Sequence, residues 1–309
     1  MKIVFCAPAI DAGTWVARLA RSLPEAQVWP WSPVVASREA DYAVVWSPHD
    51  SFFAGQHRLR AVFNMGAGVD RLLRLPGLPR EVPLFRLDDA GKARQMAEYV
   101  CHALIGHARR FGGFAAQQRA GVWRELPVEG RAAFPVGVMG LGAIGARVAQ
   151  AVASFGYPVL GWSRSRKAMA GVTGFAGPDE FDAFLQATRV LVCVLPLTPQ
   201  TDGIVNATNL RKLKPGAYVI NVGRSAHVVD ADLLAQIEAG HVAGATLDVF
   251  ATEPLPDGHA FWRHPNIRVT PHIAASTGLD ESIDQIVAKI RAIERGEAPL
   301  GRVDFERGY

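Results

Sequence analysis

The chain has 309 residues, of which 49% are hydrophobic and 20% are charged, and its formal net charge is +4. This length allows two domains, and the composition is typical of a folded globular protein rather than a disordered one. No stretch approaches the ~20 apolar residues of a membrane helix, so we expect no membrane partner. The basic residues are scattered and not interleaved with aromatic ones, which argues against nucleic acid and favours small anionic ligands.

The cysteines and the N-terminal residues indicate the cellular compartment in which the protein is expected. Cys6, Cys101 and Cys193 are odd in number, far apart and set among apolar residues, as expected for core thiols in a reducing environment. The N-terminus has one lysine and a short apolar run that ends at Pro8, and it lacks the long hydrophobic region of a signal peptide. We therefore expect a cytoplasmic protein and assign no metal or catalytic role to the cysteines.

Short apolar segments alternate with helical or loop patterns over the first 90 residues. The expected strands are residues 2–7, 42–46, 60–64 and 83–86. A helix is expected over residues 12–23, and such alternation is typical of a parallel sheet with flanking helices. The third strand is followed by MGAGVD, in which Gly66 and Gly68 leave backbone N–H groups available where ligands of open α/β sheets bind. An ordinary strand-to-helix turn explains these glycines equally well.

A single long helix is predicted over residues 92–120, where apolar side chains recur at steps of four residues. A second α/β pattern begins at Phe134. Its six expected strands are the segments PVGVM, PVLGW, VLVCVL, AYVIN, ATLDV and IRVT. Asp230 is placed to cap the helix ADLLAQIEA. An amphipathic helix over residues 279–294 is suited to packing back on the first domain.

These patterns predict an α/β protein with two domains, each built on a doubly wound parallel sheet. A Rossmann cofactor domain is expected over residues 93–273. A flavodoxin-like substrate domain is expected over residues 1–92 together with 274–309. Six strands in βα alternation are what a complete dinucleotide-binding fold requires.

The segment from Pro135 to Ser154, PVGVMGLGAIGARVAQAVAS, carries the clearest functional motif. An apolar strand turns at Gly140, Gly142 and Gly145, which fit G-x-G-x-x-G, and a helical pattern begins at once. The first glycine allows a tight turn, the second lets the backbone approach a pyrophosphate, and the third lets helix and strand pack closely. The helix N-terminus then presents N–H groups to phosphate. A turn that is merely rich in glycine is the alternative.

The end of the following strand bears on the choice of dinucleotide. NAD-binding folds usually have an acidic residue about 20 residues past the glycines, to bind the ribose 2′-hydroxyl. This chain has Ser163-Arg164-Ser165-Arg166-Lys167 there and no acid. Hydroxyl groups and cations suit a 2′-phosphate through charge-assisted hydrogen bonds, so we predict NADP(H). A solvated basic loop is the alternative.

Three residues that suit the reduction of a 2-keto acid each follow a predicted strand. Arg224 lies in NVGRSA, Glu253 in DVFATEP and His272 in TPHIAA. All three should therefore lie at one edge of the sheet, where ligands bind. Arginine offers a planar, charged fork to a carboxylate, and histidine exchanges a proton near neutral pH, with a carboxylate favouring its charged form. Taken singly, each residue also fits a structural role: a salt bridge, a surface carboxylate and a turn histidine.

The segments VGRSAHVVDADLLAQIEAG, LDVFATEPLP and TPHIAA, after GLGAIG, resemble the D-2-hydroxyacid dehydrogenase family. With WSRSRK and the ending RVDFERGY, the chain is similar to the NADPH-dependent glyoxylate and hydroxypyruvate reductases of that family. The resemblance implies that Arg224, Glu253 and His272 are catalytic and that Ala67 and Gly68 bind the substrate carboxylate through backbone N–H groups. It also implies a homodimer built around the long helix and the loop that follows it.

Further contacts are assigned on the same basis. Trp46 and Trp123 are candidate walls of the substrate cleft, Trp123 from a partner subunit, although both suit an apolar core equally well. Beyond the three glycines and Ser163, Arg164, Ser165 and Lys167, the expected cofactor contacts include several residues in strand-end turns. These are Ala143, Ile144, Leu195, Pro196, Val222, Gly223 and Asp248.

The predicted function is NADPH-dependent reduction of a short 2-keto acid, glyoxylate to glycolate or hydroxypyruvate to glycerate. Hydride reaches the keto carbon while His272, oriented by Glu253, delivers the proton. One alternative is a reductase of the same family for a bulkier 2-keto acid. The other is a dinucleotide-sensing protein that keeps the fold without turnover.

Overall fold

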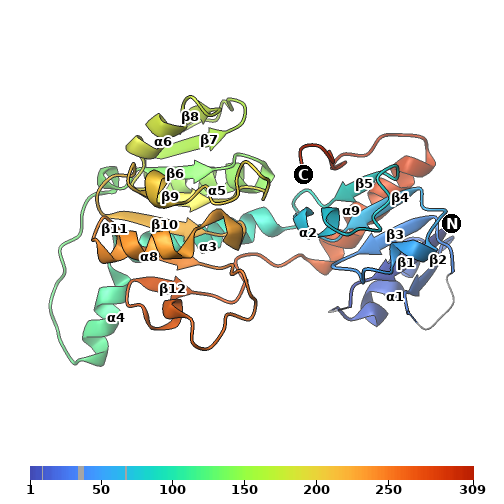
Figure 1. Ribbon diagram of the computed structural model, residues 1–309, viewed down its shortest axis with the longest axis horizontal. Coiled ribbons are helices and arrows are strands. Elements are labelled where there is room, and N and C mark those ends of the chain that lie inside the picture. Colours follow the sequence, from blue (N-terminus) through green and yellow to red (C-terminus); the bar gives the residue numbers. More distant parts are fainter. Residues whose placement is uncertain (9, 34–37, 67) are drawn as a thin grey trace. The chain divides into compact units, whose positions relative to one another are not determined.

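A computed structural model of the chain describes residues 1–8, 10–33, 38–66 and 68–309. The chain forms two compact units. We call Met1–Gly91 with Thr277–Tyr309 the terminal unit, and Lys92–Ser276 the central unit. The expected central domain, 93–273, begins one residue after the central unit and ends three residues before its end. Both units are α/β, as the sequence predicts (Figure 1).

The terminal unit contains a parallel sheet of five strands in the order β2-β1-β3-β4-β5, the doubly wound order of flavodoxin-like folds. The strands are β1 (Lys2–Cys6), β2 (Gln27–Pro30), β3 (Tyr42–Val45), β4 (Ala61–Asn64) and β5 (Leu84–Arg86). The three central strands, β1, β3 and β4, are almost wholly buried, because helices and loops cover both faces of the sheet.

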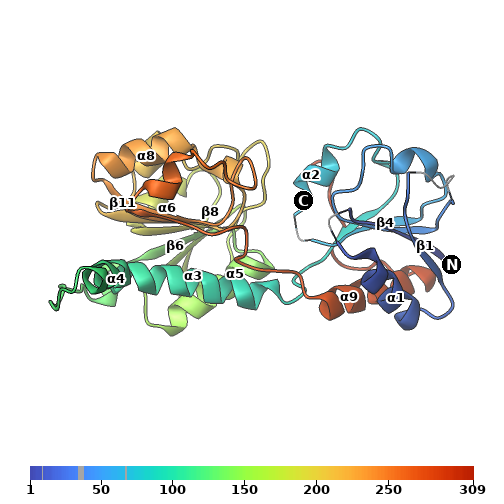
Figure 2. The ribbon, with the colours of Figure 1, turned by 90° about the horizontal axis from the view of Figure 1, so that it is seen from below.

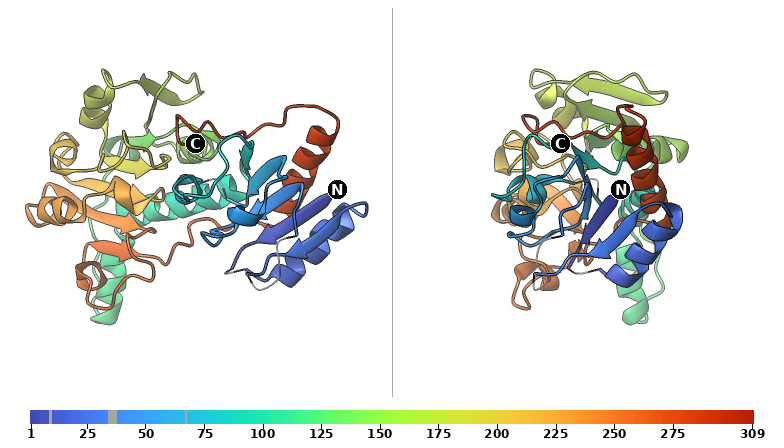
Figure 3. Two further views of the ribbon diagram at one scale, coloured as in Figure 1. Left: turned by 45° about the vertical axis from the view of Figure 1, so that its right-hand side comes forward. Right: turned by 90° about the vertical axis from the view of Figure 1, so that its right-hand side faces the viewer.

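Successive side chains of β1 point to opposite faces of the sheet and contribute to two separate hydrophobic cores of the terminal unit. Ile3 and Phe5 face helices α1 (Ala12–Ser22) and α9 (Leu279–Glu294), which pack together as the amphipathic pattern predicts. Val4 and Cys6 face the opposite core, under the short helix α2 (Asp70–Leu73). Figure 3 shows α1 and α9 on the same side of this sheet. The chain therefore crosses back to the terminal unit to complete its hydrophobic core.

The central unit contains seven parallel strands in the order β12-β11-β10-β9-β6-β7-β8. They are β6 (Val136–Met139), β7 (Val159–Ser163), β8 (Val172–Ala176), β9 (Val190–Cys193), β10 (Ala217–Asn221), β11 (Val242–Leu247) and β12 (Ile267–Val269). Counted from β6, the first six strands follow the Rossmann order 3-2-1-4-5-6, with β12 added as a seventh. The order reverses between β6 and β9, and this switch point is where such sheets bind their ligands.

Helices cover both faces of the central sheet (Figure 2). Helices α3 (Lys92–Ala108) and α5 (Ala143–Ser154) pack against one face, in a core that includes Val136 and Val138. Helices α6 (Phe181–Ala187), α7 (Ala207–Leu210) and α8 (Asp230–Glu238) pack against the other, with Met139 and Leu191. Helix α4 (Phe111–Arg119), which follows α3, contains no buried residue.

Two local predictions are wrong, and two strands were missed. The helix expected over 92–120 is broken at Arg110, whose φ of 56° is left-handed, so it forms α3 and α4 instead. Strands β2 and β8 were not predicted, because both are half-exposed edge strands without a buried apolar run. Asp230 does not cap α8: the helix begins at Asp230 itself, and its cap position is Val229.

A partly buried histidine of the central unit, His107, should make the stability of the protein depend on pH. The ring of His107 stacks on Tyr218 with centroids 4.0 Å apart. Burial, reinforced by the charges of Arg189 and Arg268, lowers the pKa of His107 from 6.5 to about 4. The unfolded chain therefore takes up this proton more readily than the folded one, and stability is lost as pH falls from 6.5 towards 4.

We expect the free energy of unfolding of the wild type to fall between pH 7.5 and pH 5 by about 2 kcal/mol more than that of His107→Phe, which keeps the ring stack. Urea unfolding followed by circular dichroism at the two pH values measures this difference. Equal acid destabilisation of the two proteins would show that His107 does not carry the effect.

Candidate active site

The turn after β6 has the geometry that a dinucleotide pyrophosphate needs. Gly140 has a φ of +98°, which only glycine adopts readily, and a Cβ on Gly145 would lie 1.7 Å from the carbonyl oxygen of Gly140. A Cβ on Gly142 would meet nothing within 4 Å, so open space lies beside the residue that precedes α5. Ala143 and Ile144 form the first turn of this 12-residue helix, whose N-terminus favours phosphate. The residues present therefore fit the predicted cofactor.

The basic loop after β7 is partly committed to internal contacts. Arg166 donates to the carbonyl oxygen of Gly174 at 2.5 Å and forms an ion pair with Glu180, whose other carboxylate oxygen accepts the N–H of Ala176. Arg166, which was not among the predicted cofactor contacts, thus ties the loop to β8. Ser163 donates to the carbonyl oxygen of Ser165 at 2.8 Å.

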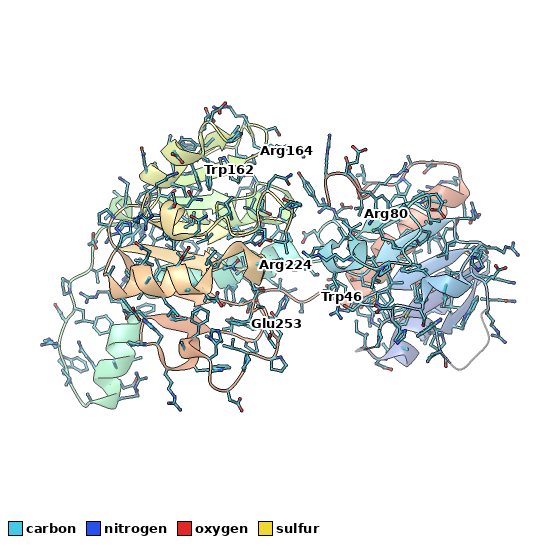
Figure 4. The ribbon with its side chains drawn as sticks, viewed as in Figure 1. Trp46, Arg80, Trp162, Arg164, Arg224 and Glu253 are labelled. Carbon is cyan, nitrogen blue, oxygen red and sulfur yellow. The ribbon has the colours of Figure 1, made fainter. Side chains whose placement is uncertain are left out.

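Arg164 and Lys167 are exposed in this loop. Figure 4 shows Arg164 at the edge of the central unit on which Arg224 and Glu253 also lie. No acidic side chain follows β7 before Lys167. The loop therefore presents cations and hydroxyl groups where an NAD-specific fold presents a carboxylate.

Two buried side chains, which the sequence reasoning missed, shape the turn that carries Arg224. Asn221 ends β10, accepts the N–H of Gly223 at 3.1 Å and donates to the carbonyl oxygen of Arg224 at 2.9 Å. His227 accepts the N–H of Arg224 on Nδ1 at 3.0 Å, so its Nε2 donates to the carbonyl oxygen of Pro196, 3.3 Å away. The turns after β9 and β10, which hold the predicted cofactor contacts Leu195, Pro196, Val222 and Gly223, are thereby joined.

Glu253 and His272 come together as the sequence predicts. Nδ1 of His272 lies 2.9 Å from Oε2 of Glu253, and because a carboxylate only accepts, Nδ1 carries the proton. The other oxygen of Glu253 accepts the N–H of Phe250 at 3.0 Å, which fixes the carboxylate. Both side chains are partly exposed, so Nε2 of His272 is left to exchange a proton with a ligand.

Asp248, predicted as a cofactor contact, is hydrogen-bonded to the turn that contains His272. It is 1% exposed at the end of β11, and its carboxylate accepts three hydrogen bonds. The donors are the hydroxyl of Thr270 at 2.6 Å, the N–H of Ile273 at 2.9 Å and the N–H of Ala274 at 2.8 Å. These donors stand on both sides of His272 in the sequence, so Asp248 fixes the turn that presents the histidine.

In the terminal unit, the turn after β4 is held by its own asparagine. Asn64 is 2% exposed and donates to the carbonyl oxygens of Gly66 and Gly68, both at 2.9 Å. Trp46, which follows β3 and is labelled in Figure 4, lies so close that a Cβ on Gly66 would be 2.2 Å from its ring. Ala67, the other predicted substrate contact, lies outside the described residues.

Three further features of the described residues concern a metal site, a reactive thiol and a membrane span. None of its groups of three or more His, Cys, Asp and Glu side chains could hold a metal ion. Cys6, Cys101 and Cys193 are buried free thiols, and burial raises the pKa of Cys6 to about 11 and that of Cys193 to about 12. Among the described helices, none is long and apolar enough to span a membrane.

Comparison with known proteins decides the family. Residues 101–274 match the family model of the D-isomer specific 2-hydroxyacid dehydrogenase NAD-binding domain. The chain belongs to the D-2-hydroxyacid dehydrogenase family. The resemblance drawn from the sequence is therefore confirmed. A glyoxylate/hydroxypyruvate reductase A of Serratia proteamaculans is 46% identical over 314 residues, with 100% of both chains covered.

Solved structures of this dehydrogenase family agree with the fold. A D-isomer specific 2-hydroxyacid dehydrogenase of Xanthobacter autotrophicus, in complex with NADPH and MES, is 40% identical with a TM-score of 0.95, covering 100% of this chain and 99% of its own. An NADPH-dependent glyoxylate/hydroxypyruvate reductase of Sinorhizobium meliloti, in complex with NADP and sulfate, is 37% identical with a TM-score of 0.93 and the same coverage. The predicted pair of Rossmann and flavodoxin-like sheets is thus confirmed.

Proposed function

We propose that this dehydrogenase reduces glyoxylate to glycolate and hydroxypyruvate to glycerate with NADPH. The observation that carries the proposal is the His272–Glu253 pair, at the sheet edge that also bears Arg224 and the cationic loop (Figure 4). Two relatives, the S. proteamaculans protein and the S. meliloti structure, bear the name glyoxylate/hydroxypyruvate reductase. NADPH, when bound, supplies the hydride.

The chain's own residues perform the rest of the proposed reaction. Arg224 binds the carboxylate and polarises the keto oxygen with its planar guanidinium. His272 donates the proton that the oxygen needs when the keto carbon is reduced, and Glu253 holds the ring and stabilises its charged form. Glu253 is itself fixed by the N–H of Phe250, so the donor is positioned before substrate binds.

A panel of 2-keto acids tests the proposal. NADPH oxidation should be fastest with glyoxylate or hydroxypyruvate and slower with pyruvate and phenylpyruvate. A preference for phenylpyruvate would instead favour the reductase for a bulkier substrate. No turnover with any of the four, under conditions in which NADPH binds, would favour a dinucleotide-sensing protein.

The proposal assigns the 2′-phosphate to the loop after β7, with Ser163, Arg164, Ser165 and Lys167 as its contacts. We expect Arg164→Ala to lower kcat/KM for NADPH by about one to two decades. A charge-assisted hydrogen bond contributes roughly 1.5–3 kcal/mol, and a tenfold change in kcat/KM corresponds to about 1.4 kcal/mol. NADH has no group at that place, so its kcat/KM should hardly change. Added salt should weaken NADPH binding more than NADH binding.

Arg166→Ala is the comparison variant for this test, because Arg166 already binds Gly174 and Glu180. Loss of these two contacts should change kcat/KM for NADPH and for NADH to a similar degree. If Arg164→Ala instead lowers kcat/KM equally for both, Arg164 supports the loop or the adenine. A wild-type enzyme that prefers NADH would contradict the assignment altogether.

We assign substrate recognition to the terminal unit through the backbone of Ala67 and Gly68 and the ring of Trp46. The support is that Asn64 and Trp46 already fix the described part of this turn. The remaining expected cofactor contacts are Gly140, Gly142, Ala143, Ile144, Gly145 and the residues of the turns after β9, β10 and β11.

We further infer a homodimer formed through α3, α4 and the segment 120–133. Helix α4 has no buried residue, Phe111 is half-exposed, and Trp123 is fully exposed, so this segment presents apolar side chains to solvent. Trp123 is then a candidate wall of the partner's substrate site. Sedimentation equilibrium should give about twice the chain mass, and a monomer at micromolar concentration would contradict the proposal.

The cytoplasm is the proposed location, since all three cysteines are buried free thiols that suit a reducing compartment. Recovery of the native protein in the periplasmic fraction of its host would contradict this.

A further inference from the structure

The turn that carries His272 has an unusual backbone for its sequence. His272 has a φ of 55°, the left-handed region that L-residues with a side chain rarely adopt. Its N–H bonds the carbonyl oxygen of Thr270 at 3.0 Å, which closes a tight turn over Pro271. A residue persists in this conformation only when its surroundings determine it strongly.

The carboxylate of Asp248 holds this turn, because it binds Thr270 before the histidine and Ile273 and Ala274 after it. Thr270 has one hydroxyl proton, and the carboxylate only accepts, so this proton lies on the Thr270–Asp248 bond. The hydroxyl oxygen of Thr270 can then only accept from its second partner.

That second partner is Tyr99, on the buried side of α3. Its hydroxyl lies 2.5 Å from Oγ1 of Thr270 and must be the donor. Burial raises the pKa of Tyr99 to about 12, so the phenol keeps its proton throughout the working pH range. A chain of hydrogen bonds thus runs from Tyr99 through Thr270 to Asp248. It links helix α3 to the turn of the histidine, 171 residues away from Tyr99.

We propose that Tyr99 is a positioning residue for catalysis, which acts through Thr270 and Asp248 on the orientation of His272. Its phenol orients the hydroxyl of Thr270 towards Asp248, and the carboxylate in turn fixes the backbone on both sides of the histidine. The inference rests on the proposed role of His272 as the proton donor. It assigns to Tyr99 no contact with substrate or cofactor.

Tyr99→Phe removes only the hydroxyl. We expect kcat to fall about 3- to 10-fold, since one partly buried hydrogen bond is lost, while KM for NADPH stays within twofold. Thr270→Val breaks both bonds and should lower kcat about 10- to 100-fold, because small misplacements of a catalytic group are costly. Thr270→Ser keeps the hydroxyl and should retain most of the activity.

The central unit offers a control. Tyr218 is a buried tyrosine whose hydroxyl, like that of the partly buried Tyr99, bonds a threonine, here Thr246 at 2.8 Å, but neither Tyr218 nor Thr246 bonds to the turn of His272. Tyr218→Phe should therefore leave kcat within twofold of the wild type. If Tyr99→Phe and Tyr218→Phe lower kcat equally, the effect of Tyr99 is one of general stability and the inference is wrong.

A double-mutant cycle separates this inference from the proposed function. In the His272→Ala background, Tyr99→Phe should change the residual rate by less than twofold, because the group it positions is gone. A further loss equal to that in the wild type would overturn the inference. If His272→Ala itself leaves the rate of hydride transfer unchanged, His272 is not the proton donor, and the proposed function is contradicted rather than the role of Tyr99. Near-normal kcat in both Tyr99→Phe and Thr270→Val would overturn the positioning role alone.

Discussion

His272→Ala should lower kcat for the reduction of glyoxylate by roughly 10²–10⁴-fold, the range that general acid catalysis contributes. The affinity for NADPH should be unchanged, since the bond of His272 to Glu253 involves none of the predicted cofactor contacts. The measurement is a stopped-flow rate with NADPH and deuterated NADPH, which shows whether hydride transfer limits turnover. His57→Ala replaces an exposed histidine of the terminal unit and is the matched control.

The pH dependence gives an independent test of the same role. Reduction consumes a proton, so the rate should fall as pH rises and His272 loses its proton. Glu253→Gln keeps an acceptor near Nδ1 but removes the negative charge, and this should move the fall to lower pH. A flat profile from mildly acidic to strongly alkaline pH, with hydride transfer limiting, would contradict the assignment.

The sequence was sufficient to predict the elements whose physical signal is local. Buried strands such as β9 and β10 appear as continuous apolar runs, and the glycine turn follows from its three spaced glycines. Edge strands β2 and β8 have one open side and mixed burial, so they carry no such run. The break at Arg110 was missed because arginine favours helices, although Gly112 and Gly113, two and three residues after it, were a usable signal.

The candidate site likewise contains residues that the sequence predicts and residues that it does not. Arg224, Glu253 and His272 could be placed because the carboxyl ends of parallel strands share one edge of a sheet. Supporting groups that lie far away in the sequence could not be predicted, as Tyr99 lies far from Thr270. Asn64 and Asn221 offered one signal: each is a polar residue at the end of a buried strand, and each binds the backbone of the turn that follows.

Arg224→Lys tests whether Arg224 recognises the keto acid by its charge alone or also by its planar guanidinium. Lysine keeps the positive charge but has no planar fork, so it cannot bind carboxylate and keto oxygen together. We expect kcat/KM for glyoxylate to fall by about 10²–10³-fold, the cost of losing one preorganised donor to a developing oxyanion. Binding of NADPH, measured by fluorescence titration, should be retained.

The backbone around Arg224 makes this comparison a clean one. Asn221 and His227 bind the main chain of residues 223 and 224, so the turn should keep its shape when only the side chain changes. A crystal structure of the variant checks that point directly. His227→Gln is the complementary change: it leaves the guanidinium intact but alters the contact to the N–H of Arg224, and its loss in kcat/KM should be smaller. If the lysine variant keeps near-normal kcat/KM on glyoxylate, charge alone suffices and the two-point recognition of the keto acid by Arg224 is wrong.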